Sequence, residues 1–496
     1  MHFTSENLLL IGSILVFSAI LVSKTGYKYG VPALLVFLLV GMLFGSDGLG
    51  IVFNNYRQAQ FVGIAALSVI LFSGGMETKI ANIRPVLRQG IILSTLGVFL
   101  TALFTGAFIF FITRVEGISL SLSIIMCLLL ASVMSSTDSA SVFNILKNSK
   151  LKLKEHIQPT LELESGSNDP MASVITIVLI QAANVLFDPS SSTQGINYGT
   201  LIWGSLWTLF KQIAIGGLMG IGMGLGGSMI VDKINLKSTP LKAILLLSIA
   251  FFTISVTAII EGNGYLAVYV AGLIIGNRTF NDKKAILQFF DGMTWMMQIG
   301  MFLTLGLLVN PHEMMKVAPV ALLIGLFLIF IARPLAVFIS LSFIRGISVR
   351  AKTFISWVGL KGAVPIIFAT YPIVAGIPGS EQIFNIVFFI TILSMTIQGM
   401  TMPKVAHWLH LSLPQDEKPE TFGIEMPEEA GRLKDYTLAK DDLSEGNTLK
   451  EVSLPDGARV VMIKRNEKFI VPDGTVHLKV GDKLLMIISD NEQNAL

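Results

Sequence analysis

The chain is dominated by long apolar runs that are separated by short polar segments. Runs of close to 20 mostly apolar residues recur from about residue 7 to residue 410, and this is the length that a helix needs to cross a bilayer. Only 14% of the residues are charged, against about 25% in soluble domains. The pattern predicts an all-α, multi-span membrane protein with spans near 7–23, 31–46, 60–76, 90–113, 119–145, 159–186, 201–231, 243–261, 263–277, 287–309, 318–344, 354–375 and 383–402. The first run lacks a basic segment and a cleavage site, so we expect a retained span and not a signal peptide.

Lysine and arginine are distributed unevenly among the predicted loops. The loops that follow odd-numbered spans are rich in them, whereas the alternate loops carry only Arg57, Arg114 and Lys316. Cytoplasmic loops are enriched in these residues, so we predict the amino terminus outside and the carboxyl terminus in the cytoplasm. The same distribution accounts for the net charge of +3 without a nucleic-acid partner.

The composition changes after Leu411. An acidic, proline-containing stretch is followed by short β-branched runs that alternate with turns such as Pro-Asp-Gly and Val-Gly-Asp, a pattern typical of antiparallel β-structure. We therefore divide the chain into a membrane domain (1–410), a linker (411–421) and a small α+β cytoplasmic domain (422–496). This last part is too short for a complete nucleotide-binding Rossmann domain and contains no G-x-G-x-x-G, so we do not expect NAD binding.

The fifth span contains a carboxylate within a run of hydroxyl side chains. Asp138 lies in "VMSSTDSASV", and a charged residue inside the membrane is a functional candidate because burying it there is costly. Hydroxyl side chains weaken a helix locally. The cluster therefore predicts a broken transporter helix, whose free carbonyls and helix ends replace the water shell of a cation. The alternative is a serine-rich helix contact from which Asp138 reaches toward the surface.

The sixth span begins with the acidic stretch "LELESGSNDP". At helical spacing, Ser165 and Asp169 share one face, and Glu164 and Asn168 share an adjacent one. Two carboxylates from neighbouring helices, a serine hydroxyl and a backbone carbonyl would supply oxygen ligands for a monovalent cation. The same carboxylates would bind protons, and this competition would couple the two flows. The alternative is that the acids complement the helix dipole, which is the role we assign to Glu162.

Two basic residues lie inside predicted spans. Arg333, in the eleventh span, needs a buried counter-ion, and we predict an ion pair with Glu164; removing one partner would cost about 3–5 kcal/mol. Lys361 lies in "GLKGAVPII", an interruption of the twelfth span. It either offsets the dipole ends of two crossing broken helices or extends to the cytoplasmic surface. Interruptions in the fifth and twelfth spans, one in each half of the chain, indicate an inverted repeat.

Other features suggest no additional chemistry. We place Asp291 near a membrane interface, Glu261 in an external turn, and Cys127 as an inert buried thiol. The sequence has no Walker A pattern, no TVGYG filter and no cluster of His or Cys ligands. ATP-driven pumping and conduction through a selectivity filter therefore have no support in the sequence.

Four segments together resemble the NhaP-type monovalent cation:proton antiporters. They are "SSTDSASVF", "LELESGSNDPMA", "FISWVGLKGAVPIIFATYP" and "QGMTMPKVAHWL". The resemblance covers nearly the whole chain and is closest to the potassium/proton branch that carries a C-terminal TrkA-C (RCK-C) domain. It implies a thirteen-helix inverted repeat, a homodimer in the bacterial inner membrane, and an elevator-like movement of a core domain.

The resemblance also assigns residues. The family's Thr-Asp pair falls on Thr137 and Asp138, its Asn-Asp pair on Asn168 and Asp169, its Glu-Ser pair on Glu164 and Ser165, and its buried arginine on Arg333. The Asn-Asp pair is similar to that of electroneutral members, which implies one cation per proton.

The sequence departs from the family pattern at three positions. Ser139 follows Asp138 where many relatives have proline, and Lys361 replaces an arginine. Ser73, in "LFSGGME", stands where relatives commonly have an acid. One carboxylate fewer would weaken the electric field at the site and favour a larger cation, so we expect potassium to be preferred over sodium.

The sequence thus predicts a secondary antiporter that exchanges potassium, or sodium, for protons in cation and pH homeostasis, without a resident cofactor. The C-terminal domain is similar to regulatory modules that dimerise and that in some relatives bind cyclic dinucleotides or other small effectors; the alternative is a structural dimer clamp. An RCK-regulated potassium channel or uniporter is the main alternative function, and a receptor that uses a transporter fold is a third.

Overall fold

The computed structural model divides the chain into two compact units, residues 1–414 and 415–496. It describes residues 5–28, 30–116, 122–138, 141–142, 145–146, 149, 151–187, 197–234, 236, 238–280, 282–413, 433–438, 441–443, 446–452, 454, 458–465 and 468–487. The division lies close to the predicted end of the membrane domain. The limits of the linker and of the C-terminal domain remain predictions.

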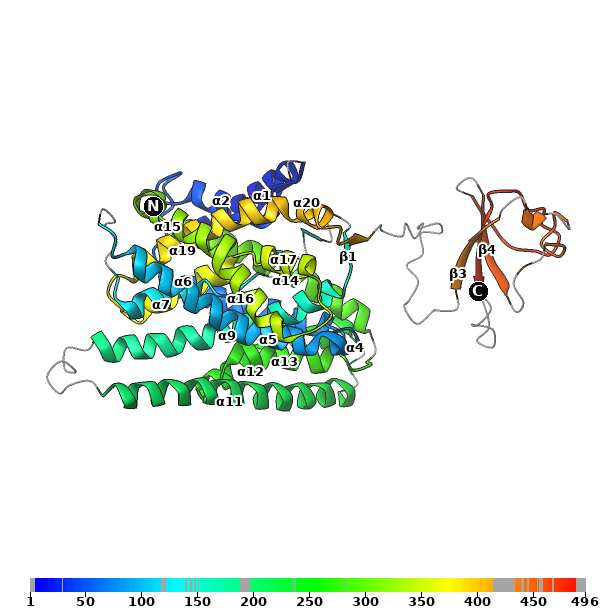
Figure 1. Ribbon diagram of the computed structural model, residues 1–496. Coiled ribbons are helices and arrows are strands. Elements are labelled where there is room, and N and C mark those ends of the chain that lie inside the picture. The colour runs from blue at the N-terminus through cyan, green and yellow to red at the C-terminus, as the bar shows by residue number, and fades with distance from the viewer. Residues whose placement is uncertain are drawn as a thin grey trace. The chain divides into compact units, whose positions relative to one another are not determined.

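The first unit is a bundle of long helices that run roughly parallel to one another (Figure 1). In its first half the helices are α1 (Ser5–Lys28), α2 (Ala33–Phe44), α3 (Tyr56–Glu77), α4 (Ile80–Ile83), η1 (Arg84–Val86), α5 (Leu87–Ile92), η2 (Leu93–Gly97), α6 (Val98–Ile112), α7 (Ile124–Val133) and α9 (Ile157–Phe187). The second half contains α11 (Tyr198–Lys233), α12 (Thr239–Ile259), α13 (Gly264–Gly276), α14 (Lys283–Leu308), α15 (Pro311–Phe327), η3 (Leu328–Ala332), α16 (Arg333–Ser340), η4 (Leu341–Phe343), α17 (Val349–Trp357), α18 (Ala363–Val374), α19 (Ser380–Ser394), η5 (Met395–Gly399) and α20 (Met400–Trp408). A short antiparallel pair, β1 (Lys152–Leu153) and β2 (Ser412–Leu413), joins two distant segments.

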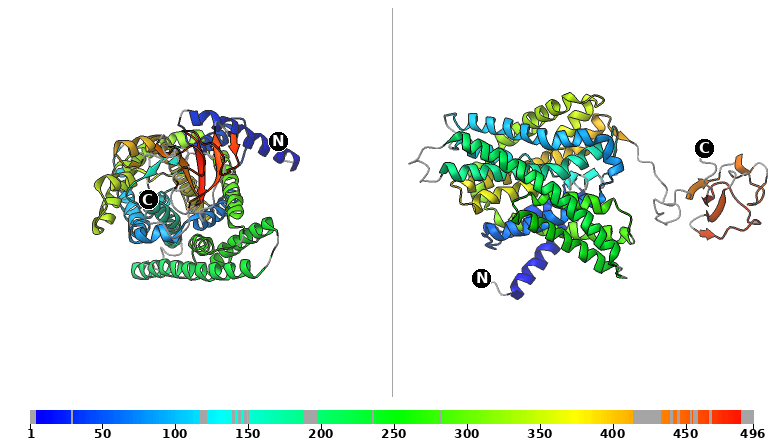
Figure 2. Two further views of the ribbon diagram at one scale, coloured as in Figure 1. Left: turned by 90° about the vertical axis from the view of Figure 1, so that its right-hand side faces the viewer. Right: turned by 90° about the horizontal axis from the view of Figure 1, so that it is seen from below.

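The multi-span helical class predicted from the sequence is confirmed. Among the described residues, seven helical segments are long and apolar enough to cross a membrane, and five shorter apolar helices accompany them. Helix α14 covers the tenth predicted span and belongs to neither group. The number of thirteen spans therefore remains a prediction. Helix α11 lies at one edge of the bundle in Figure 1 and in the left view of Figure 2.

Two helical spans are interrupted, and their interruptions lie against each other. Helix α7 ends at Val133 and residues 134–138 are not helical, while residues 358–362 separate α17 from α18. The backbone N–H of Asp138 donates to the carbonyl oxygen of Leu360 at 2.8 Å. This bond uses backbone groups that a continuous helix would have paired internally, so the two interruptions partly satisfy each other.

Close backbone packing holds α3 against α13. A Cβ atom at Gly272 would lie 2.4 Å from the carbonyl oxygen of Phe72, and one at Gly276 would lie 2.2 Å from that of Met76. Only a residue without a side chain allows this approach, which is typical of helix contacts inside membranes. The contact fixes the end of α3 beside the end of α13, where Asn277 Nδ2 donates to the carbonyl oxygen of Thr78 at 2.8 Å.

The second unit contains an antiparallel sheet, which the alternating sequence pattern predicted. Its strands are β3 (Leu433–Thr437), β4 (Arg459–Arg465), β5 (Lys468–Ile470) and β6 (Lys483–Ile487), in the order β3-β6-β4-β5. A 3₁₀ turn, η6 (Asp441–Leu443), follows β3. Leu438, Ile463 and Leu484 are in its small buried core.

Candidate functional site

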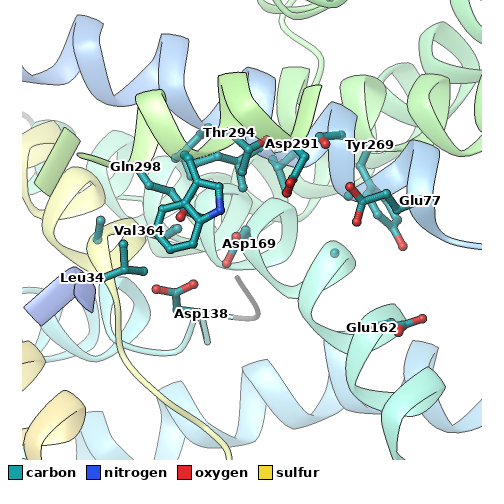
Figure 3. A pocket seen from close by; sticks show the side chains of 18 of the residues that line it. Leu34, Glu77, Asp138, Glu162, Asp169, Tyr269, Asp291, Thr294, Gln298 and Val364 are labelled. Carbon is teal, nitrogen blue, oxygen red and sulfur yellow. The ribbon is translucent and has the colours of Figure 1, made fainter. Parts of the chain in front are cut away.

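A cavity of about 600 Å³ opens inside the membrane unit. Side chains from α2, α3, α9, α13, α14, α18 and the interrupted segment after α7 line it. Five carboxylates face it, and Figure 3 shows Asp138 and Asp169 on one side of the view, Glu77 and Glu162 on the other, and Asp291 between them. Oxygen atoms that converge on a membrane cavity are what a hard cation or a proton requires.

Asp138 lies at the junction of the two interrupted spans. Its Oδ2 accepts from the Ser141 hydroxyl at 2.6 Å, and its Oδ1 accepts from the Ser141 N–H at 3.1 Å. A Cβ atom at Gly362 would lie 1.7 Å from Asp138 Oδ2. The glycine therefore admits the carboxylate to the start of α18, where the helix dipole favours a negative charge.

Asp169 lies within α9, directly before Pro170. Its Oδ1 accepts a hydrogen bond from the hydroxyl of Ser136, and the neighbouring Asn168 donates from Nδ2 to Thr137 Oγ1. Two side-chain hydrogen bonds thus join α9 to the interrupted segment of α7. Asn168 Oδ1 is buried and has no hydrogen-bond partner among the described residues. Neither Asn168 nor Thr137 is among the described residues that line the cavity, so their roles as cation ligands remain predictions.

Ser165 is the predicted neutral ligand of α9. It is 5% exposed, but it is not among the residues that line the cavity. The residues of α9 that do so are Gln158, Glu162, Gly166 and Asp169, which follow the i, i+4, i+8, i+11 spacing of one helix face. The role of Ser165 as a neutral ligand remains a prediction.

Glu164 and Arg333 form a buried ion pair away from the cavity. Arg333 Nη2 donates to Glu164 Oε1, and the two side chains are 2% and 1% exposed. Arg333 begins α16, directly after the π-helical turn η3. Neither side chain lines the cavity. The structure therefore brings together the two residues that the sequence analysis paired, on α9 and α16.

Lys361 lies in the crossing of the interrupted spans. It is 1% exposed, its Nζ donates to the carbonyl oxygen of Ser136 at 2.8 Å, and its backbone N–H donates to Ser394 Oγ at 2.9 Å. Of the two alternatives left open by the sequence, this position corresponds to the first. The ammonium group compensates a carbonyl beyond the C-terminal end of α7, where the helix dipole favours a positive charge.

Several residues of the cavity were misjudged or missed from the sequence. Glu162 is not a helix-start charge, because α9 begins at Ile157 and has no acid in its first turn. Asp291 also lines the cavity, as does Glu77 of the "LFSGGME" segment. Nothing in the sequence around Tyr269 indicates a role in the cavity. The seven-residue spacing from Glu162 to Asp169, in contrast, indicates that both acids share one helix face.

Ser136 was part of the predicted hydroxyl run but not a predicted site residue. Its hydroxyl donates to Asp169 and its carbonyl accepts from Lys361. One residue therefore links the carboxylate of α9 to the lysine of the crossing. A search of the sequence for charged groups cannot find Ser136, because its role depends on its hydrogen bonds to Asp169 and Lys361, which are distant in the sequence.

Interrupted helices that cross beside buried carboxylates, in a multi-span unit with an internal cavity, define a secondary ion transporter. The chain belongs to the family described as sodium/hydrogen exchanger, transmembrane, which matches residues 12–408, and the TrkA-C domain matches residues 433–496. The resemblance read from the motifs is thereby confirmed. Members of the family are cation/proton antiporters, so the chain is a secondary transporter and not an enzyme.

Similar proteins support this placement. The K(+)/H(+) antiporter NhaP2 of Shewanella baltica is 37% identical over 500 residues, which are 99% of this chain and 82% of that protein. The K(+)/H(+) antiporter NhaP of Alkalimonas amylolytica is 37% identical over 97% of this chain and 81% of its own length. The structure of the sodium proton antiporter MjNhaP1 from Methanocaldococcus jannaschii has the same fold, with a TM-score of 0.65 and 23% identity over 79% of this chain and 99% of that one.

Proposed function

We propose that this protein exchanges potassium, in preference to sodium, for protons, with one cation moved per proton. The names of the relatives at 37% identity support potassium as the cargo. Asn168 precedes Asp169, so this pair contributes a single carboxylate, which supports an electroneutral cycle. The cations are cargo, and the proposal includes no resident cofactor.

The observation that carries the proposal is the position of two carboxylates on one cavity. Asp138 enters from an interrupted span and Asp169 from α9, and both line the same space. In the proposed cycle Asp169 binds either a proton or the cation. Asp138 and oxygen atoms of Thr137, Ser165 and Asn168 complete the cation's ligands.

Three further residues support the geometry of this cycle. The Glu164–Arg333 pair holds α9 against α16 and carries neither proton nor cargo. The ammonium group of Lys361 binds the carbonyl of Ser136. Its positive charge repels other cations from the place where the two interrupted spans cross. A movement of the core past the remaining helices would expose the carboxylates alternately to the two sides of the membrane.

We also propose the cellular arrangement. The loop charges support an amino terminus outside the bacterial inner membrane and a C-terminal domain in the cytoplasm. The family resemblance supports a homodimer. The TrkA-C match supports regulation of transport, and so of cation and pH homeostasis, by a small effector, with cyclic dinucleotides as one class to test.

A channel or uniporter is not favoured, because the relatives at 37% identity are antiporters. The two mechanisms differ in a measurable way. Antiport dissipates an imposed pH gradient when cation is added, without net current in the electroneutral case. A channel conducts current and does not need a titrating carboxylate at Asp169.

The test is antiport in proteoliposomes with potassium, sodium and lithium, for the wild type and for Asp169→Asn and Asp138→Asn. We expect the wild type to show cation-dependent proton flux, highest in apparent affinity for potassium, and both variants to lose it. If both variants keep full coupled exchange, the proposed function is wrong.

A further inference from the structure

The cavity contains a second group of oxygen atoms, separate from Asp138 and Asp169. Glu162 lines the cavity two helical turns before Asp169, which places the two residues about 10 Å apart along the axis of α9. Glu162 accepts a hydrogen bond from Gln158 Nε2 at 3.1 Å. None of the described residues that line the cavity is Lys or Arg, so none of them neutralises this carboxylate.

Tyr269 packs on the turn of α9 that separates these two acids in the sequence. A Cβ atom at Gly166 would lie 2.3 Å from Tyr269 Cε2 and 2.7 Å from its hydroxyl oxygen, so the ring packs directly on α9 one turn after Glu162. Figure 3 shows the hydroxyl directed toward the part of the cavity where Glu162 lies. Glycine at 166 is required for this position, because any side chain would displace the tyrosine.

The same hydroxyl is buried and unsatisfied. Tyr269 is 4% exposed, and its oxygen makes no hydrogen bond of normal geometry among the described residues, with the Thr78 side chain as its nearest polar neighbour. Buried tyrosine hydroxyls usually have a partner, because leaving one unpaired costs free energy. An oxygen atom that faces a cavity without a protein partner is therefore available to a ligand that the cavity contains.

The backbone supplies a third oxygen at the same level. Pro170 lies inside α9 and has no N–H, so it cannot donate to the carbonyl oxygen of Gly166, four residues earlier. Gly166 itself lines the cavity. A carboxylate, a phenol oxygen and a carbonyl freed by Pro170 thus belong to residues that line the same cavity, where the described lining includes no Lys or Arg. These oxygen types are a donor set for a hard monovalent cation.

We propose that Glu162, the Tyr269 hydroxyl and the Gly166 carbonyl form an outer subsite for a partly hydrated monovalent cation. The inference rests on the proposed function, because the subsite would bind the cation before it reaches Asp169. A cation held here has replaced part of its water shell with protein oxygen and lies about two helical turns from the exchange site. The subsite raises the local cation concentration, so its loss acts on apparent affinity more than on the maximal rate.

The direct test is binding of rubidium to the full-length protein in detergent, with radioactive Rb⁺ as the probe. In Asp169→Asn the inner site is impaired, and we expect weak binding to persist. Adding Glu162→Gln should weaken that residual binding about tenfold, and adding Tyr269→Phe about fivefold, which are the changes expected for a lost charged and a lost neutral oxygen ligand. Glu381→Gln and Tyr198→Phe, outside the cavity, are the matched controls and should leave it unchanged.

The second readout is transport by the single variants in proteoliposomes. Glu162→Gln and Tyr269→Phe should raise the apparent KM for potassium by these same factors, about tenfold and fivefold, with a smaller loss of maximal rate. Gly166→Ala, which displaces the tyrosine, should resemble Tyr269→Phe. A variant that does not fold is recognised by its aggregation on size exclusion, and the remaining two then decide the outcome.

Two results would overturn the subsite. One is an Asp169→Asn protein that binds no Rb⁺ although the wild type does. The other is residual binding that neither Glu162→Gln nor Tyr269→Phe weakens. Both leave the proposed function intact, whereas that function fails separately if wild-type proteoliposomes show no cation-dependent proton flux.

Discussion

Two acids on the same helix, Glu164 and Asp169, have different surroundings although both are almost completely buried. They are 1% and 6% exposed and lie five residues apart on α9. Glu164 points to the guanidinium of Arg333, whereas Asp169 faces the cavity and accepts from a serine hydroxyl. A permanent cationic partner leaves no place for a cargo ion, while a hydroxyl partner does. The comparison teaches that the hydrogen-bond partner of a buried acid, and not its degree of burial, distinguishes a structural acid from one that exchanges protons and cations.

The largest effect on transport is expected for Asp169→Asn. The variant removes the group that binds proton and cation, so coupled exchange should fall by at least about 100-fold, a loss of roughly 2.7 kcal/mol or more. The ion pairs described in the structure do not include Asp169, so the midpoint of thermal unfolding in detergent should not fall. Proton flux in proteoliposomes measures the loss of exchange, and a thermal melting curve in detergent measures the stability. A large loss of thermal stability would make Asp169 a structural acid like Glu164.

The opposite pattern is expected for Glu164→Gln. This variant leaves Arg333 as a buried charge without its partner, so stability should fall by about 3–5 kcal/mol. Thermal unfolding in detergent and the yield of monodisperse protein report the loss. The transport of whatever protein remains folded should still be coupled.

The double variant Glu164→Leu/Arg333→Met sharpens this prediction. Replacing a buried ion pair by apolar residues of similar volume is often neutral or stabilising. We therefore expect it to recover most of the stability and the exchange activity. Persistent loss of coupled exchange in a stable double variant would show that Glu164 takes part in the exchange itself.

A moderate effect is expected at the crossing. Lys361→Met removes the donor to the Ser136 carbonyl, and Ser136 is also the residue that donates to Asp169. Exchange should slow by about tenfold, because a hydrogen bond from a charged donor is worth about 1.5–3 kcal/mol. The matched control is Lys352→Met, since Lys352 Nζ donates to the carbonyl of Leu341 outside the cavity. Equal slowing in both variants would argue against a special role of the crossing lysine.

A smaller effect, on selectivity, is expected for Ser73→Asp. Ser73 is 3% exposed and lines the cavity, so the added carboxylate strengthens the field there and favours the smaller cation. The ratio of apparent affinities for potassium and sodium should shift toward sodium by about tenfold, or roughly 1.4 kcal/mol. Proton flux measured over a range of each cation gives the ratio. An unchanged preference would remove Ser73 from the explanation of selectivity.

The smallest effect on transport is expected for the carboxylate–arginine pair of the C-terminal unit. Arg465 donates from Nε and Nη2 to the two carboxylate oxygens of Asp482. Burial raises the pKa of Asp482, but the hydrogen bonds from Arg465 and from the Lys479 N–H outweigh it, so the pKa lies below its usual value. A lowered pKa in the folded state stabilises the unit above the pKa of the unfolded chain, and this stability is lost as the pH falls through the folded value.

Two measurements on the full-length protein test this pair. Asp482→Asn should destabilise the C-terminal unit by about 2 kcal/mol at neutral pH and leave the basal exchange rate unchanged. Limited proteolysis of that unit should increase in the wild type only under acid conditions, and in the variant already at neutral pH. Proteolysis that does not depend on pH in either protein would contradict the expected stabilisation.

The sequence predicted features whose signal is local and missed those that depend on packing. Apolar runs defined the spans, and hydroxyl and glycine clusters marked both interruptions, because these features are set by the residues of one segment. Glu162 was misjudged because the start of α9 was unknown. Tyr269 was missed because its position depends on α13 packing against α3 and on a glycine of α9.

The central claim is that proton and cation compete for Asp169, and the pH dependence of potassium affinity tests it most directly. The initial rate of exchange in proteoliposomes is measured over a range of potassium concentrations at several pH values. The account predicts that, at pH values low enough for the proton to occupy the site, the apparent KM for potassium rises about tenfold for each unit by which the pH falls, with an unchanged maximal rate, as expected for one proton that displaces one cation. An apparent KM that stays constant while the maximal rate titrates would contradict it, because proton and cation would then bind at different places.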